Sequence, residues 1–200
     1  AGAAGVAVSN MLLAAGVPEL AAQLAASQFD AADNMTDRQG ALGVLCGLDS
    51  PLRAEKLAAF HARHAGDALV IDKWFALQSQ MPERADGRAF ARVKRLLQHA
   101  DFTLANPNRA RSLIQVFCTG NPAAFHRSDA GGYVLWADAV REIDGFNSSL
   151  AARIARAMDR WMHLAEPYRS AAREAIVRVS EKKDLSAGVR EIVARALNQT

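Results

Sequence analysis

The sequence has only two cysteines, few aromatic residues and no long apolar run, and each scarcity narrows the possible folds. Aromatic residues make up 6% of the 200 residues, and apolar residues seldom alternate with polar ones, which argues against β-sheet. No apolar stretch reaches the roughly 18 residues that a membrane span needs, so no membrane is expected as a partner. Cys46 and Cys118 each lie in an apolar helical stretch, which predicts buried thiols in a reducing cytoplasm.

Charge of one sign is also lacking, because 24 basic residues are interspersed with 21 acidic ones along the chain. This pattern is typical of a solvated surface. The most basic helix face, with Arg88, Arg92, Lys94 and Arg95, has no interleaved aromatic residues, so nucleic acid is not expected as a partner. The Ala/Gly-rich start has no initiator Met and no basic segment, which suggests a fragment or a processed chain rather than a signal peptide.

What the sequence does contain is apolar spacing of three and four residues between frequent helix-capping signals. Thr36 to Gln39 fits a capping box, and Ser50-Pro51, Asn106-Pro107 and Asn121-Pro122 each place a capping residue before a proline at the first helical position. Leu150, Ile154, Ala157, Trp161 and Leu164 share one helix face. The predicted helices include those at 37–48, 67–80, 88–99, 167–181 and 185–197.

Short helices joined by short turns pack on their sequence neighbours in antiparallel pairs. The sequence therefore predicts an all-α fold, an irregular α-solenoid of antiparallel helix pairs similar to an armadillo or HEAT superhelical array. The length suits one sizeable core, so we expect a single helical domain over residues 1–200. Residues 1–16 carry no charged, leucine-spaced pattern, and the sequence leaves their structure open.

A search for catalytic patterns finds no strong one. His61 and His64 can share a helix face, but no third ligand is evident and the chain contains no His-Glu-x-x-His string, so an exposed polar helix end is the expectation. Cys118 and His126, eight residues apart, are interpreted as packing residues. Asp138 and Glu142 form an i,i+4 pair of the kind found on solvated helix faces.

The arginines are the best candidates for a binding site. Arg109 and Arg111 follow the Asn106 cap, and Arg153, Arg156 and Arg160 line one side of the helix that begins near Leu150. Guanidinium groups on a concave helical surface suit a carboxylate through bidentate hydrogen bonds. Spacing alone leaves solvated arginines or structural ion pairs as the alternative.

Several strings of this chain resemble the C-terminal domain of the bacterial aminopeptidase N family of zinc exopeptidases. The resemblance runs from about residue 17 to the end of the chain. It is carried by Ala31-Ala32-Asp33-Asn34-Met35-Thr36-Asp37, Leu69-Val70-Ile71-Asp72-Lys73-Trp74-Phe75-Ala76-Leu77-Gln78, Leu97-Gln98-His99, Phe102-Thr103, Asn106-Pro107-Asn108-Arg109-Ala110-Arg111-Ser112-Leu113, Asn121-Pro122-Ala123-Ala124-Phe125-His126 and Gly132-Tyr133.

The resemblance implies a helical array that caps the catalytic domain of the same polypeptide and closes a chamber over its active site. It implies zinc as the cofactor of the full-length enzyme and none in this fragment, which contains neither His-Glu-x-x-His nor Gly-x-Met-Glu-Asn. By motif position it assigns Arg111 and Arg153 to the C-terminal side of a bound peptide substrate. The isolated 200 residues are therefore expected to be inactive.

The alternative is a free-standing helical-repeat scaffold that binds a protein partner in its concave groove, as such surfaces often do.

Overall fold

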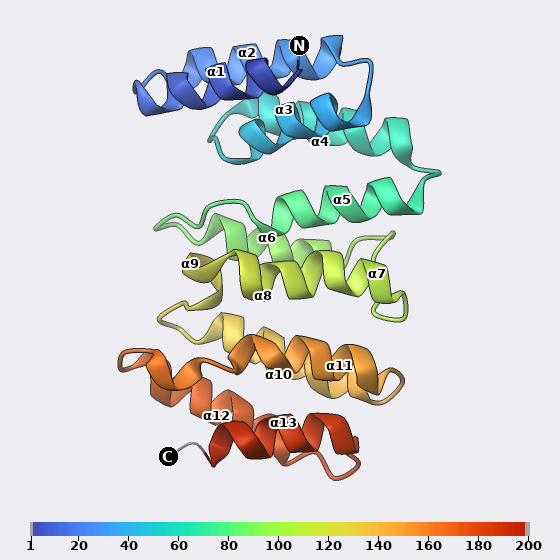
Figure 1. Cartoon of the computed structure of the whole chain (residues 1–200), viewed down its shortest axis with the longest axis vertical. Helices are drawn as coiled ribbons and strands as arrows, with labels where there is room; N and C mark the ends of the chain where they lie inside the picture. The colour runs from blue at the N-terminus through green and yellow to red at the C-terminus, as the bar shows by residue number, and fades with distance from the viewer. Residues whose placement is uncertain (1, 199–200) are drawn as a thin grey trace. The chain divides into compact units, whose positions relative to one another are not determined.

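The computed structural model describes residues 2–198, with side chains from residue 5. All regular elements of this described range are helices, which confirms the all-α prediction (Figure 1). None of these helices is long and apolar enough to span a membrane. The chain divides into two compact units, residues 1–77 and 78–200, which are described separately below. The single domain over residues 1–200 stays a prediction.

The first unit is built from consecutive helices connected by short turns (Figure 1). The first three pack against one another, and α4 packs on both α2 and α3. The Ala/Gly-rich start, which the sequence left open, is the helix α1. The helices are α1 (Gly2–Ala14), α2 (Pro18–Ala31), α3 (Met35–Cys46), α4 (Pro51–His64) and α5 (Ala68–Ser79), the last of which crosses the boundary between the units.

Small side chains hold the first unit together. Ala21 and Ala25 on α2 are completely buried and lie in one cluster with Val44 and Leu45 of α3. Alanine has the highest helix propensity and allows close approach of helix axes, so an alanine-rich stripe serves both the helix and its packing. The stripe explains why so few aromatic residues suffice here.

Helix caps set the ends of these helices. Asn34 caps α3, because its side chain accepts a hydrogen bond from the Asp37 backbone N–H at 2.9 Å. The predicted capping box at Thr36 therefore lies inside the helix, which begins two residues earlier than that cap implied. Ser50 caps α4 as predicted, by accepting from the Leu52 backbone N–H.

The second unit starts with shorter helices and ends with longer ones. Helix α10 packs against α11 and α12, and α13 packs against the same two, as neighbouring antiparallel pairs do (Figure 1). The elements are α6 (Arg88–Leu96), α7 (Pro107–Ala110), the π-helix η1 (Arg111–Gln115), α8 (Val116–Gly120), α9 (Pro122–Phe125), α10 (Gly131–Asp144), α11 (Ser148–Ala155), the 3₁₀ turns η2 (Arg156–Met158) and η3 (Trp161–His163), α12 (Tyr168–Ser180) and α13 (Ala187–Leu197).

Buried tryptophans tie these pairs together. The Trp136 indole N–H of α10 donates to the Ile154 carbonyl of α11 at 3.0 Å, and the Trp161 indole donates to the Ala196 carbonyl of α13 at 3.1 Å. The helix predicted to run from Leu150 through Leu164 ends at Ala155 and continues as two 3₁₀ turns. These turns allow the Trp161 ring to reach α13, a contact that the predicted continuous helix did not include.

A glycine permits a close approach of two helices in the second unit. A Cβ atom at Gly132 would lie 2.1 Å from the Phe125 carbonyl oxygen, so only glycine fits at this crossing of α10 with α9. The next residue, Tyr133, is completely buried and packs edge-on against the Phe125 ring. The Gly132-Tyr133 pair, one of the strings that carry the family resemblance, therefore serves to pack α10 against α9.

An ion-pair network joins two loops at the same end of α6. The Glu83 carboxylate accepts hydrogen bonds from the Ala89 and Phe90 backbone N–H groups, at 3.0 and 2.9 Å. Arg127 donates to Glu83 at 3.1 Å and to Asp129 at 2.8 Å, and its guanidinium lies over the Phe90 ring. The Arg127 guanidinium holds the pKa of Asp129 down at about 2.

Candidate functional site

The segment that carries Arg109 and Arg111 is organised by Asn106. The Asn106 side chain caps α7 by accepting from the Asn108 and Arg109 backbone N–H groups, which confirms the predicted cap. Arg109 is buried, and its guanidinium donates to the Asp101 carbonyl. Arg109 therefore has a structural role, as the alternative interpretation of the arginines proposed.

Arg111 differs from its neighbour because it is half-buried and its guanidinium donates to the Asn108 side-chain oxygen. The contact with Asn108 is between neutral and charged groups, so the positive charge of Arg111 is oriented but not neutralised by it. An oriented, uncompensated guanidinium is suited to an anionic ligand.

Arg111 is also the first residue of the π-helix η1. A π-helical turn adds one residue to the helical repeat and so changes which side chains face the core on either side of it. Here it allows Leu113, Ile114 and Phe117 to be buried together. Such turns occur frequently at functional sites, and no residue type in the sequence indicated this one.

Arg153 lies on the solvent side of α11. Leu150, Ala151 and Ile154 face the core, and Asn147 caps the helix by accepting from the Leu150 backbone N–H at 3.0 Å. The Arg153 side chain is exposed, and within residues 5–198 it forms no recorded ion pair. Arg153 thus combines a fixed backbone with a charge that is available to a ligand.

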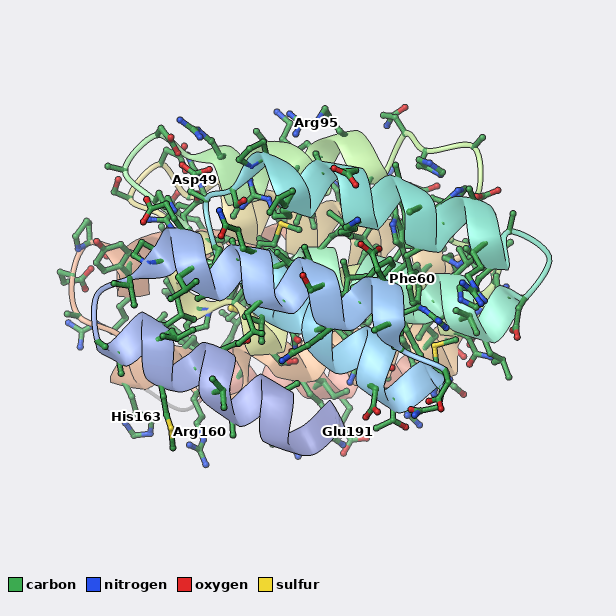
Figure 2. All side chains as sticks on the ribbon, turned by 90° about the horizontal axis from the view of Figure 1, so that it is seen from above. Asp49, Phe60, Arg95, Arg160, His163 and Glu191 are labelled. Atoms are coloured by element: carbon green, nitrogen blue, oxygen red, sulfur yellow. The ribbon has the colours of Figure 1, made fainter. Side chains whose placement is uncertain are left out.

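The two candidate arginines lie on adjacent elements, because α11 packs against η1 within the second unit. Their neighbours are less suited to a ligand. Arg156 lies 3.7 Å from the Asp159 carboxylate, and Arg160 projects outward from the 3₁₀ region beyond the end of α11 (Figure 2).

The residues considered for metal or nucleophilic chemistry make packing contacts. The His61 ring packs on Trp74 at 4.8 Å and the His64 ring on Phe60 at 4.9 Å, so both histidines are only partly exposed at the end of α4. Burial raises the pKa of the Cys118 thiol, which opposes formation of the thiolate nucleophile. His126 has a pKa lowered by burial and is hydrogen-bonded to the Tyr133 hydroxyl at 2.7 Å.

The sequence did not reveal an open groove of the second unit, between α6 and α10. Its volume is about 760 Å³. Its walls come from three separate stretches of chain, so no single motif could have indicated it.

These observations define the protein class as an all-α array of paired helices with a pair of available arginines. A family described as a domain of unknown function with ARM repeats (DUF3458_C) matches residues 6–198. The chain belongs to this family and corresponds to the C-terminal domain of aminopeptidase N. The family confirms the predicted armadillo-like fold.

The chain spans about a fifth of the length of the curated relatives that it matches. It is 36% identical over 169 residues to the aminopeptidase N of Caulobacter vibrioides, which covers 84% of this chain and 19% of the relative. It is 34% identical over 185 residues to the Escherichia coli aminopeptidase N, which covers 92% and 21%. A crystal structure of Legionella pneumophila aminopeptidase A in complex with aspartic acid aligns with a TM-score of 0.83 at 27% identity, over 91% of this chain and 21% of that one.

Proposed function

We propose that this chain is the capping and substrate-access domain of a cytoplasmic zinc aminopeptidase that removes N-terminal residues from peptides. The similarity to three aminopeptidases over most of the chain supports this role. The partners of the domain are then the catalytic domain of the same polypeptide and the peptide substrate.

The residues of this chain do not fit the catalytic zinc. The chain has no His-Glu-x-x-His string, the pattern that supplies two zinc ligands and the general base in such peptidases. The zinc ligands would therefore come from another part of the full-length chain. The isolated chain should show no turnover of an aminoacyl anilide, and activity that survives purification and follows the folded fragment would contradict this assignment.

Arg111 and Arg153 would recognise the C-terminal carboxylate of the peptide. The observation that carries this role is that Arg111 and Arg153 have uncompensated charges and lie on two elements in contact, η1 and α11. The Arg109 guanidinium, in contrast, donates to a backbone carbonyl. A bidentate guanidinium–carboxylate contact holds the far end of the substrate without taking part in bond cleavage.

The test compares two substrates in the full-length protein. A charge-assisted hydrogen bond contributes about 1.5–3 kcal/mol, so Arg153→Ala should raise KM for a short peptide by about tenfold or more. It should leave KM for an aminoacyl anilide, which has no carboxylate, nearly unchanged. Arg153→Lys should restore part of the loss, because charge returns without the planar fork.

Arg156→Ala is the matched control, since Arg156 lies three residues further along and pairs with Asp159. The carboxylate role is refuted if Arg153→Ala and Arg156→Ala have the same effect, or if peptide and anilide are affected equally. A full-length protein that lacks aminopeptidase activity would refute the whole assignment, and the helical scaffold that binds a protein partner would then be preferred.

A further inference from the structure

The backbone that carries Arg111 is anchored by buried polar side chains, all of which belong to the second unit. The Ser112 hydroxyl donates to the Arg109 carbonyl at 2.8 Å, and the Ser79 hydroxyl donates to the Ser112 carbonyl at 3.3 Å. The Asn121 carboxamide, in a residue that is 4% exposed, donates to the Ser79 carbonyl at 2.9 Å. Carbonyls near a π-helix need such partners, because the wider turn changes the usual helical pairing. The main chain at Arg111 is therefore fixed within its unit.

The side chains of this segment differ in what they face. Arg109 is buried, whereas Asn108 is exposed and Arg111 is half-buried, three residues further along, where the two can meet on one helix face. The Arg111 guanidinium donates to the Asn108 side-chain oxygen. No acidic side chain among residues 5–198 forms a recorded ion pair with Arg111. Asn108 is thus the side chain that orients this guanidinium, and it does so without cancelling its charge.

Orientation of an arginine before a ligand binds has a physical benefit. A free arginine side chain samples many rotamers, and fixing it in one of them costs conformational entropy when the ligand binds. A hydrogen bond that already selects one rotamer removes part of this cost, so an oriented guanidinium binds a carboxylate more tightly than a mobile one. A carboxamide leaves the positive charge available, whereas a carboxylate at the same position would pair with it. Asparagine therefore suits position 108 better than aspartate.

We propose that Asn108 is a positioning residue that holds the Arg111 guanidinium ready for the C-terminal carboxylate of the peptide substrate. This inference rests on the proposed function and adds a residue to the same site. Arg153 has no recorded side-chain partner among residues 5–198, so of the two candidate arginines Arg111 is the one that another side chain orients. Because Asn108 acts through Arg111, its replacement should weaken binding of the peptide carboxylate without slowing bond cleavage.

The test uses one short peptide in two forms, with a free C-terminal carboxylate and with a C-terminal carboxamide, as substrates of the full-length protein. The KM of the amide divided by the KM of the acid measures recognition of the carboxylate. Asn108→Ala should lower this ratio about threefold to fivefold, with kcat within about twofold of wild type. Asn108→Asp should lower it about tenfold or more, because the new carboxylate pairs with Arg111 and repels that of the peptide. Asn108→Gln keeps a carboxamide and should lie between Asn108→Ala and wild type.

A double-mutant cycle tests whether Asn108 acts through Arg111. In a protein that already carries Arg111→Ala, Asn108→Ala should change the KM ratio by less than about twofold. Asn198→Ala, at an exposed asparagine of the same unit, is the matched control and should keep the wild-type ratio. Ala105→Asp adds the charge of Asn108→Asp at an exposed position three residues earlier, and it should lower the ratio less than Asn108→Asp does. Thermal melting establishes that each variant is folded.

Three results would overturn the inference. The first is a wild-type KM ratio in Asn108→Asp, and the second is additive effects of Asn108→Ala and Arg111→Ala. The carboxylate role of Arg111 survives both results if Arg111→Ala alone lowers the ratio. The third is a wild-type protein that binds the acid and the amide equally, which would refute the carboxylate role itself and this inference with it. A fall in kcat of Asn108→Ala at an unchanged ratio would assign Asn108 a purely structural role and also overturn the inference.

Discussion

Replacement of Gly132 by alanine tests the close contact between this glycine and the Phe125 backbone. The added Cβ would lie 2.1 Å from the Phe125 carbonyl oxygen and 2.8 Å from its carbonyl carbon, and both are backbone atoms that no rotamer change can move. Helices α9 and α10 must therefore separate by more than about 1 Å to reach ordinary contact distances. Because Tyr133 and Trp136 next to this crossing are completely buried, the separation loosens the core around them.

The expected magnitude follows from two opposing contributions. Overpacking of a core costs about 1–3 kcal/mol, and a backbone clash belongs at the upper end of that range. Alanine regains up to about 1 kcal/mol over glycine in helix propensity. Gly132→Ala should therefore lower the free energy of unfolding by about 2 kcal/mol, which corresponds to a drop in Tm of about 4–8 °C for the unit that contains it.

The assay is urea unfolding of the variant and of a matched control, Gly188→Ala. At Gly188 of α13 a Cβ would meet only the Ala152 Cβ atom, at 3.9 Å, which is ordinary contact. The control should be neutral or stabilised by up to about 1 kcal/mol. Equal stability of Gly132→Ala and Gly188→Ala would refute the argument that the α9–α10 crossing requires glycine.

Two further predictions concern ion pairs of the second unit. Asp144→Ala should lower the free energy of unfolding, measured with urea, by about 2–3 kcal/mol. The reason is that the Asp144 carboxylate is 0% exposed and accepts hydrogen bonds from Lys182 and from the Ser186 backbone N–H. A loss below about 0.5 kcal/mol would contradict this prediction. Asp129→Asn should cost at most about 1 kcal/mol at pH 7, since the side chain is 58% exposed. Because Arg127 depresses the folded pKa of Asp129 to about 2 from its ordinary 3.8, the stabilisation is complete above pH 3.8 and is lost as pH falls toward 2. A stability gap between wild type and Asp129→Asn that does not shrink over this range would refute that linkage.

Local signals in the sequence predicted much of the helical framework. Ser50, Asn106 and Asn121 cap helices as expected, because a capping side chain and the proline that follows it act within one turn of chain. The cap predicted for α3, Thr36, is wrong. Asn34 and Thr36 can both cap a helix, and it is Asn34 that accepts the hydrogen bond from the Asp37 backbone N–H. Competition between near-equal local signals is resolved by where the rest of the helix packs.

The candidate site was less predictable. Arg109 and Arg111 are two residues apart and chemically identical in the sequence, yet the first donates to a buried carbonyl and the second is held half-exposed beside Asn108. Arg153 and Arg156 differ in the same way, because only Arg156 has an acidic neighbour within reach. The assignment of Arg111 and Arg153 to a substrate carboxylate stays a prediction.

Short-range sequence patterns specify the helical class, most helix starts and the family, since capping, apolar spacing and motif strings are all local in the chain. Tertiary structure alone decided where helices change type. The π-helix at Arg111 and the 3₁₀ turns after Ala155 form because buried side chains such as Phe117 and Trp161 must reach partners elsewhere in the fold. The groove also depends on tertiary packing, since its lining residues on α6, on α10 and at Ile114 are far apart in the sequence.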